Sequence, residues 1–165
     1  MPNNRDNPCG FEFVRSLDGE AVILSAEAGV DLLKGDAVHM ESAVLQVAVN
    51  TDTKIYGIMA ADADCGDQGM FYPAVPEYVF EVQSSHTVPF VAATHTNFAC
   101  ELAGGTGVME LHLVVGGGTM QFIVYRLADT KVEAVPNIVG ANARVYCTIY
   151  QSQFLGIPGV TQVHA

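Results

Sequence analysis

The sequence is poor in positive charge. It contains seven Lys and Arg residues against 18 Asp and Glu, which gives a formal net charge of -11 at pH 7. Proteins that bind DNA or RNA gain much of their affinity by neutralising phosphates with clustered Lys and Arg side chains. Because the chain has no such cluster, its composition excludes direct nucleic-acid binding as an expected function.

Long apolar runs are also missing. No stretch approaches the ~18 uninterrupted apolar residues that a membrane-spanning helix needs, so we expect no membrane contact. Residues 1–8 are polar and lack the apolar segment of a secretory signal. In a chain without such a signal, cysteines outside CxxC pairs are expected to be free thiols in a reducing cytosol rather than disulfides. This expectation covers Cys9, Cys65, Cys100 and Cys147.

Motifs for metal binding and nucleophilic catalysis are absent as well. The chain has five histidines, which are His39, His86, His95, His112 and His164. None of them belongs to an HxH, HxxxH or HExxH arrangement. There is no GxSxG segment, and the residues around Cys100 match no catalytic signature. We interpret Cys100 as an ordinary cysteine of an apolar strand, and His112 as a residue on the polar side of its strand.

Two loops invite a functional interpretation and do not meet its requirements. The acidic run Asp62, Asp64 and Asp67 suggests a calcium loop, but the fifth position counted from Asp62 is Gly66, where an oxygen ligand is needed. The segment 104–107 is rich in Gly but has no P-loop lysine. We therefore expect no enzyme, no cofactor and no metal, and we assign no catalytic, cofactor-binding or metal-binding residue.

What the chain does contain is a series of short apolar runs. Half of its residues are hydrophobic and only 15% are charged, so 165 residues can bury roughly 70% of their unfolded surface in one domain. Runs of Val, Ile, Leu, Phe and Tyr, broken by Gly, Asp and Asn, are typical of strands. They predict an all-β domain, a β-sandwich or Greek-key barrel, without intervening helices.

The predicted strands end at polar or Gly-containing turns. They cover residues 11–15, 21–24, 37–40, 43–49, 54–59, 70–72, 78–82, 99–102 and 143–150. The clearest local pattern is a hairpin over residues 108–127, in which two alternating segments flank the loop Gly116–Gly118. We place this hairpin at the core of the domain.

The polar ends of the chain are expected to be extended. Residues 1–10 form an N-terminal arm that a partner would order, 11–155 form the β domain, and 156–165 form a C-terminal tail. No repeat of fixed length stands out, although a polar stretch near 83–86 suggests two lobes, 11–82 and 87–155. In the arm, we expect Pro2, Asn3, Asn4 and Pro8 to contact the partner.

The order of these elements resembles phage capsid decoration proteins, also called head-stabilising or cement proteins. The similarity covers residues 20–83 well and 97–155 loosely. It is carried by the turn Leu32–Val38 (of the type L-x-K-G-D-x-V), Ile55–Ile58, Ala63–Gly69, Pro76–Val82, and Arg144–Ile149 with Phe154 just beyond. K-G-D turns also occur in biotinyl and lipoyl domains, but Lys34 lacks the E-x-M-K-M or D-K-A context of a modified lysine.

The resemblance implies a non-enzymatic structural protein of the virion. Such a protein is assembled in the host cytoplasm, binds the major capsid protein on the capsid exterior, and stabilises the mature shell. It also implies a homo-oligomer, a trimer, because similar decoration proteins occupy three-fold and quasi-three-fold positions. Two alternatives stay open: another virion component, such as a head fibre base or tail tube protein, and a small β-barrel ligand-binding domain or enzyme. The last would require histidines and acids to converge in a pocket.

Overall fold

The predicted fold class is confirmed by a computed structural model. It describes residues 9–85, 89–113, 119–129, 131–132 and 135–153. Of the residues described, 48% are strand and 3% helix, and most strands belong to two antiparallel sheets. Within these ranges, no helix has the length and apolar character needed to cross a membrane.

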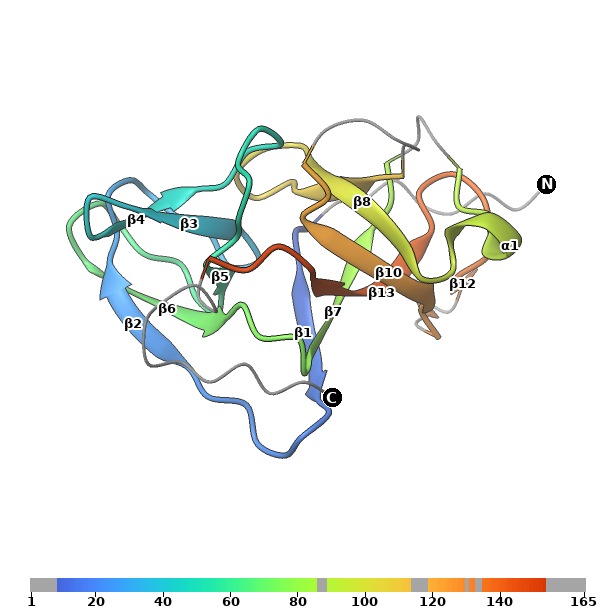
Figure 1. Cartoon of the computed structure of the whole chain (residues 1–165), viewed down its shortest axis with the longest axis horizontal. Helices are drawn as coiled ribbons and strands as arrows, with labels where there is room; N and C mark the ends of the chain where they lie inside the picture. Colours follow the sequence, from blue (N-terminus) through green and yellow to red (C-terminus); the bar gives the residue numbers. More distant parts are fainter. Residues whose placement is uncertain (1–8, 86–88, 114–118, 130, 133–134, 154–165) are drawn as a thin grey trace.

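The described elements follow the chain from β1 to β13 (Figure 1). They are β1 (Glu12–Ser16), β2 (Leu24–Glu27), β3 (Ala37–Glu41), β4 (Val44–Val47), β5 (Gly57–Met59), β6 (Gln68–Pro73), β7 (Tyr78–Gln83), α1 (Ala92–His95), β8 (Phe98–Ala103), β9 (Glu110–His112), β10 (Phe122–Leu127), β11 (Lys131–Val132), β12 (Val135–Pro136) and β13 (Arg144–Ile149).

The first sheet curls into a ring. Its strand order is β2-β6-β5-β3-β4, with antiparallel neighbours. Just beyond β2, Ala28 forms a parallel bridge with Leu45 of β4, and the amide of Gly29 donates to the Leu45 carbonyl (2.8 Å). The last strand therefore meets the first, and we call this ring the N-terminal barrel.

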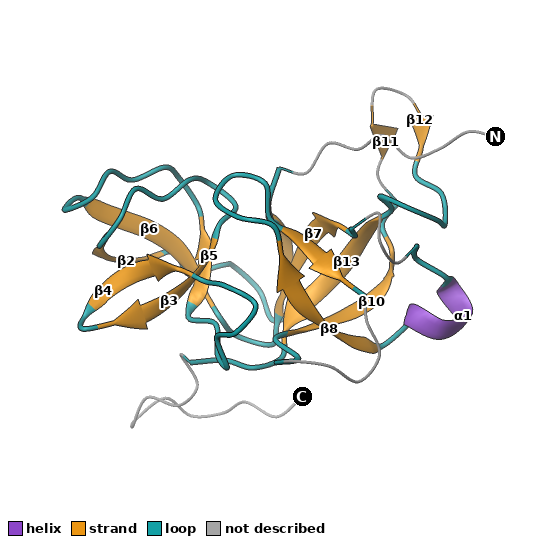
Figure 2. Ribbon diagram, turned by 90° about the horizontal axis from the view of Figure 1, so that it is seen from above, coloured by secondary structure: helices purple, strands orange, loops and turns teal. Residues whose placement is uncertain are grey.

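The second sheet curls in the same way. Its order is β1-β7-β13-β10-β8-β9. Just beyond β7, Ser84 forms a parallel bridge with Leu111 of β9, and the amide of Ser85 donates to the Leu111 carbonyl (2.8 Å). We call the ring of β7, β13, β10, β8 and β9 the C-terminal barrel. The strand β1 is added to the free edge of β7, and Figure 2 shows the two barrels side by side.

The two barrels have one topology. If the five strands of each are named in chain order, both rings read first, fifth, fourth, second, third, closed by a parallel contact between third and first. The registers agree as well. The amide of Ala28 donates to the carbonyl of Asp67, and at the equivalent position of the other barrel the amide of Ser84 donates to the carbonyl of Ala143. The chain is thus two structural copies of one five-stranded barrel.

Following the paired residues around each ring gives a consistent set of equivalent positions. Leu24 corresponds to Phe80, Val38 to Cys100, Leu45 to Leu111, Gly57 to Phe122 and Phe71 to Cys147. The separation between equivalents varies along the chain, from Leu24 and Phe80 at one extreme to Phe71 and Cys147 at the other. No repeat of fixed length could therefore appear in the sequence.

Each barrel has its own apolar interior, and one core extends between them. The N-terminal barrel encloses a cluster of Ala28, Leu32, Val38, Leu45, Met59, Ala63 and Phe71. A larger cluster fills the C-terminal barrel and includes Ala37 and Ile58, which alternate with the interior residues of β3 and β5. Phe11 joins it by stacking on Phe122 (ring centroids 4.7 Å apart). The shared cluster fixes the two barrels against each other.

The structure differs from the sequence-based fold in four details. The proposed hairpin 108–127 is not a hairpin, because β8 lies between β9 and β10 and pairs with both. The expected buried strand 21–24 begins only at Leu24, and Val22 and Ile23 are exposed. One short helix, α1, does intervene. The change from one sheet to the other falls between β6 and β7, whereas the sequence suggested a division near 83–86.

Candidate functional site

The K-G-D turn lies where the two barrels meet. Asp36 is fully buried there. One of its carboxylate oxygens accepts a hydrogen bond from the amide of Leu33 (2.9 Å) within the turn. The other accepts from the amide of Gly107 (2.7 Å), in the loop between β8 and β9. The carboxylate therefore joins a turn of the N-terminal barrel to a loop of the C-terminal barrel.

The surroundings of Asp36 shift the pKa of its carboxyl group in opposite directions. Burial removes water from the carboxylate and raises its pKa, while the amide hydrogen bonds from Gly107 and Leu33 act in the opposite direction. The negative charge of Asp62 adds to the rise. The net result is a pKa above the usual range, in a carboxyl group that serves as a joint.

Gln121 forms a second polar joint. It is fully buried, and its side-chain oxygen accepts from the amide of Leu102 on β8 (2.8 Å). Its side-chain nitrogen donates to the carbonyls of Val49 (3.0 Å) and Asp52 (2.7 Å), in the loop after β4. One amide side chain thus satisfies three backbone groups from the two barrels.

A buried ion pair anchors the start of β13. The guanidinium of Arg144 donates to a carboxylate oxygen of Glu81 on β7 (2.5 Å), and both side chains are less than a tenth exposed. The same guanidinium lies 3.4 Å from Glu12 of β1 and 3.6 Å from the sulfur of Cys9. These contacts tie the entering chain to the C-terminal barrel.

The beginning of the described chain packs on the K-G-D turn. Gly10 is buried and adopts a φ of 76°, and a Cβ atom at this position would meet the carbonyl oxygen of Gly35 at 2.6 Å. The amide of Phe11 donates to that same oxygen (2.9 Å). Glycine is therefore required at position 10 by backbone conformation and close approach together. The expected partner-binding residues of the arm, Pro2, Asn3, Asn4 and Pro8, lie outside the described residues.

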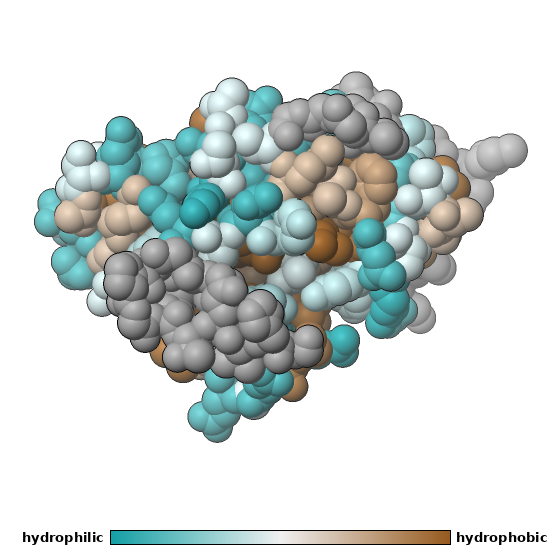
Figure 3. Space-filling model, viewed as in Figure 1, coloured by the Kyte–Doolittle hydropathy of each residue, from teal (hydrophilic) through white to brown (hydrophobic). Residues whose placement is uncertain are grey.

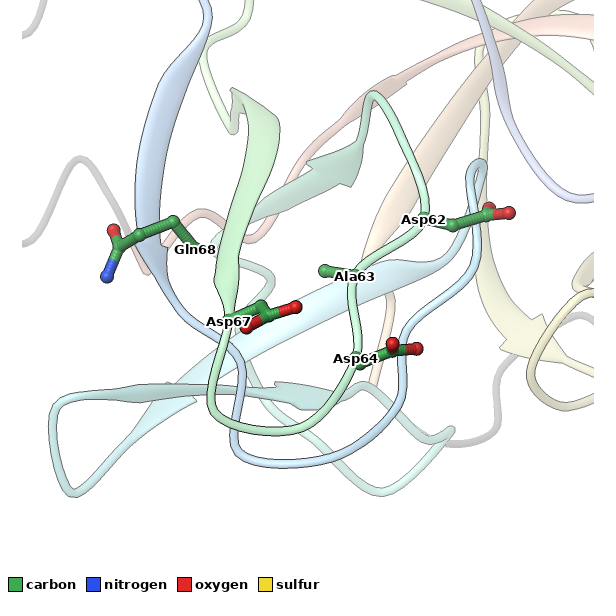
Figure 4. A pocket seen from close by; sticks show the side chains of 5 residues that line it. All are labelled: Asp62, Ala63, Asp64, Asp67 and Gln68. Carbon is green, nitrogen blue, oxygen red and sulfur yellow. The ribbon is translucent and has the colours of Figure 1, made fainter.

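The acidic loop lines a shallow pocket of about 270 Å³ between β5 and β6. It is bordered by Asp62, Ala63, Asp64, Asp67 and Gln68. In Figure 4, Asp62 and Asp64 lie on one limb of the loop and Asp67 on the other, and the carboxylate of Asp62 is turned away from Asp67. Asp62 accepts from the amide of Lys34 (2.7 Å). In the described part of the chain, no cluster of three or more His, Cys, Asp or Glu residues is arranged to hold a metal ion.

The three histidines that the structure describes do not come together. His39 lies 3.1 Å from Asp52, and His112 lies 3.2 Å from Glu101, on the polar side of β9 as predicted. His95 accepts from the amide of Val91 (2.9 Å) at the start of α1, and burial lowers its pKa. His86 and His164 lie outside the described residues. These three histidines therefore do not converge with acidic residues in one pocket, which is the arrangement that the enzyme alternative requires.

All four cysteines are free thiols. Cys100 and Cys147 are fully buried on adjacent parts of the C-terminal barrel, and burial raises the pKa of both thiols. A raised pKa keeps a thiol in its neutral, weakly nucleophilic form. Cys100 is an apolar-strand residue, as predicted.

Sequence reasoning missed the joints formed by Gln121 and by Arg144 with Glu81. The only local signal is a polar side chain inside an apolar run, such as Gln121 between Met120 and Phe122. Such a side chain must find hydrogen-bond partners if it is buried, but a local pattern cannot name them. The chain matches no protein-family model and has no significant sequence match among curated proteins.

Proposed function

We propose that this chain is a non-enzymatic structural protein of a phage particle, which binds the exterior of the capsid and stabilises the mature shell. One observation carries the proposal. Three segments of the resemblance to decoration proteins supply two of the three joints described above: Leu32–Val38 supplies Asp36, Pro76–Val82 supplies Glu81, and Arg144–Ile149 supplies Arg144. The resembling residues thus include the carboxylate that joins the two barrels and the ion pair that anchors β13 within the C-terminal barrel.

The surface also supports an assembly role. Exposed carboxylates outnumber exposed cations, which suits an outer position away from packaged DNA. Large apolar side chains are exposed as well, and apolar surface outside a core marks sites of association. Figure 3 shows apolar surface gathered over β8 and β10, beside a hydrophilic region over β3. The exposed apolar residues include Val14, Leu17, Val22, Ile23, Met70, Val91, Val108 and Val139.

The test is to mix the purified protein with expanded, undecorated shells of the cognate phage and to image them by electron microscopy. Regular density at local three-fold positions and a higher melting temperature of the shell are expected. Shells that stay bare at saturating protein would refute the proposal. The number of copies per particle separates a decoration protein, which covers the shell, from a head fibre base or tail tube protein.

A further inference from the structure

The duplicated barrels differ along one strand edge. β7 pairs with β13 on one side and with β1 on the other. Its counterpart β2 pairs with β6 on one side. On its second side, the described structure shows contact only just beyond the strand, where Ala28 bridges to Leu45. Figure 1 shows β2 at the border of its sheet and β7 inside its own.

Hydrogen bonds at the end of β2 show which peptide groups face this open edge. The amide of Ala28 donates to Asp67, across the ladder to β6, and the amide of Gly29 donates in the opposite direction, to β4. Peptide groups alternate between the two edges of a strand. Those of Ile23 and Ser25 therefore face the same side as Gly29, which is the open edge.

In the C-terminal barrel the equivalent peptide groups are paired. Ile23 and Ser25 correspond to Val79 and Glu81, which pair with Arg15 and Glu12 of β1. The edge that β1 covers in one barrel is thus open in the other, with the same peptide groups presented.

The side chains show the same contrast. Val22 and Ile23 are 55% and 48% exposed, whereas their equivalents Tyr78 and Val79 are 5% and 3% exposed. The start of the open edge is also held in place, because the amide of Val22 donates to the hydroxyl of Tyr78 (2.6 Å). A preorganised, apolar edge lowers the entropic cost of accepting a strand.

We propose that residues 22–25 accept an extended strand of the shell protein, antiparallel to β2, in the way that β7 accepts β1. This inference rests on the proposed function. The strand β1 is the template for the occupant, since it is antiparallel to β7 and alternates apolar and charged residues. Exposed carboxylates of Asp18, Glu20 and Glu27 flank the open edge along the chain. The occupant therefore combines alternating apolar side chains with at least one Lys or Arg.

The test compares cosedimentation of variants with expanded shells. Ser25→Pro removes an outward amide without removing a hydrogen bond of the β2–β6 ladder, and Val22→Ser removes apolar surface. We expect Ser25→Pro to weaken shell binding at least roughly tenfold and Val22→Ser to weaken it several-fold. Val139→Ser is the matched control, because Val139 is 54% exposed and lies away from this edge, and its binding should equal that of wild type. Thermal melting of each free variant reports folding.

Hydrogen exchange on decorated shells is the second measurement, and it decides the matter if Ser25→Pro does not fold. The amides of Ile23 and Ser25, which face the open edge, should exchange more slowly in the bound protein than in the free protein. Suppose that wild type binds, that Ser25→Pro and Val22→Ser bind as tightly as wild type, and that binding does not slow exchange of the edge amides. The edge is then not the docking site, although the proposed function stands. If wild type leaves shells bare, both proposals fail. If Ser25→Pro instead dissociates an oligomer and leaves shell binding intact, the occupant is a second copy, and the assignment to the shell protein is wrong.

Discussion

Replacing Arg144 by Met should destabilise the protein strongly. The Arg144 guanidinium is held by Glu81 at 2.5 Å, and the two side chains are 9% and 7% exposed. The substitution keeps most of the side-chain volume but leaves the carboxylate of Glu81 buried without its cation. Removing one partner of a buried ion pair typically costs about 3–5 kcal/mol, because an uncompensated charge stays in the interior.

The assay is urea unfolding followed by far-ultraviolet circular dichroism. With an m-value of about 2 kcal/mol/M, a loss of this size lowers the midpoint by about 1.5–2.5 M. The double variant Arg144→Met with Glu81→Leu removes both charges and should recover much of the loss, so that the coupling energy in the double-mutant cycle is about 2 kcal/mol or more.

An exposed ion pair supplies the control. Arg126 and Asp129 lie 2.8 Å apart, but their side chains are 48% and 73% exposed. Pairs of this kind contribute little to stability in water, so Arg126→Met should leave the urea midpoint nearly unchanged. If Arg144→Met behaves like Arg126→Met and the cycle shows no coupling, burial of the Arg144–Glu81 pair does not anchor β13.

Other consequences of the joints are open to measurement. Gln121→Met removes the side-chain hydrogen bonds of the Leu102 amide and the Asp52 carbonyl, whereas the Val49 carbonyl still accepts from the amide of Asp52. The free energy of unfolding should fall by about 2–4 kcal/mol; an unchanged urea midpoint would show that the two groups find other partners. The pKa of Asp36 is raised in the folded state, so the folded protein binds this proton more tightly than the unfolded chain, and the contribution of Asp36 to stability should fall as pH rises from about 4 through the raised pKa. As pH rises over that range, the free energy of unfolding of Asp36→Asn should therefore increase relative to that of wild type. A decrease would mean that the pKa of Asp36 is lowered, not raised, on folding. Gly10→Ala should destabilise by about 1–3 kcal/mol, whereas Gly105→Ala, with no atom near its Cβ position, should not; equal melting temperatures would contradict the close packing at Gly10. Light scattering after gel filtration should give a trimer, and a 17.5 kDa monomer at micromolar concentrations would count against it.

Strands and turns were predictable here, but their pairing was not. The alternation of Val145, Cys147 and Ile149 with polar neighbours, and the turn at Gly35, are local signals, because side chains alternate across a strand and Gly permits positive φ. Pairing depends on contacts distant in sequence. Residues 108–127 have the pattern of a hairpin, yet β8 inserts between its two halves, since Cys100 pairs with Phe122 and Leu102 with Leu111.

The duplication escaped detection because most of the equivalent positions named above hold different residues in the two barrels. In the N-terminal barrel Gly57 lies beneath the ring of Phe71, and a Cβ atom on Gly57 would approach that ring to 2.6 Å. The equivalent pair in the C-terminal barrel is Phe122 with Cys147, so the aromatic residue has moved from the fifth strand to the fourth. Close packing constrains the sum of facing side chains more tightly than either one. Gly57→Ala alone should therefore overpack its barrel, and pairing it with Phe71→Leu should recover only part of the lost stability, because the carbonyl oxygen of Tyr72 lies even closer to that Cβ position than the ring does.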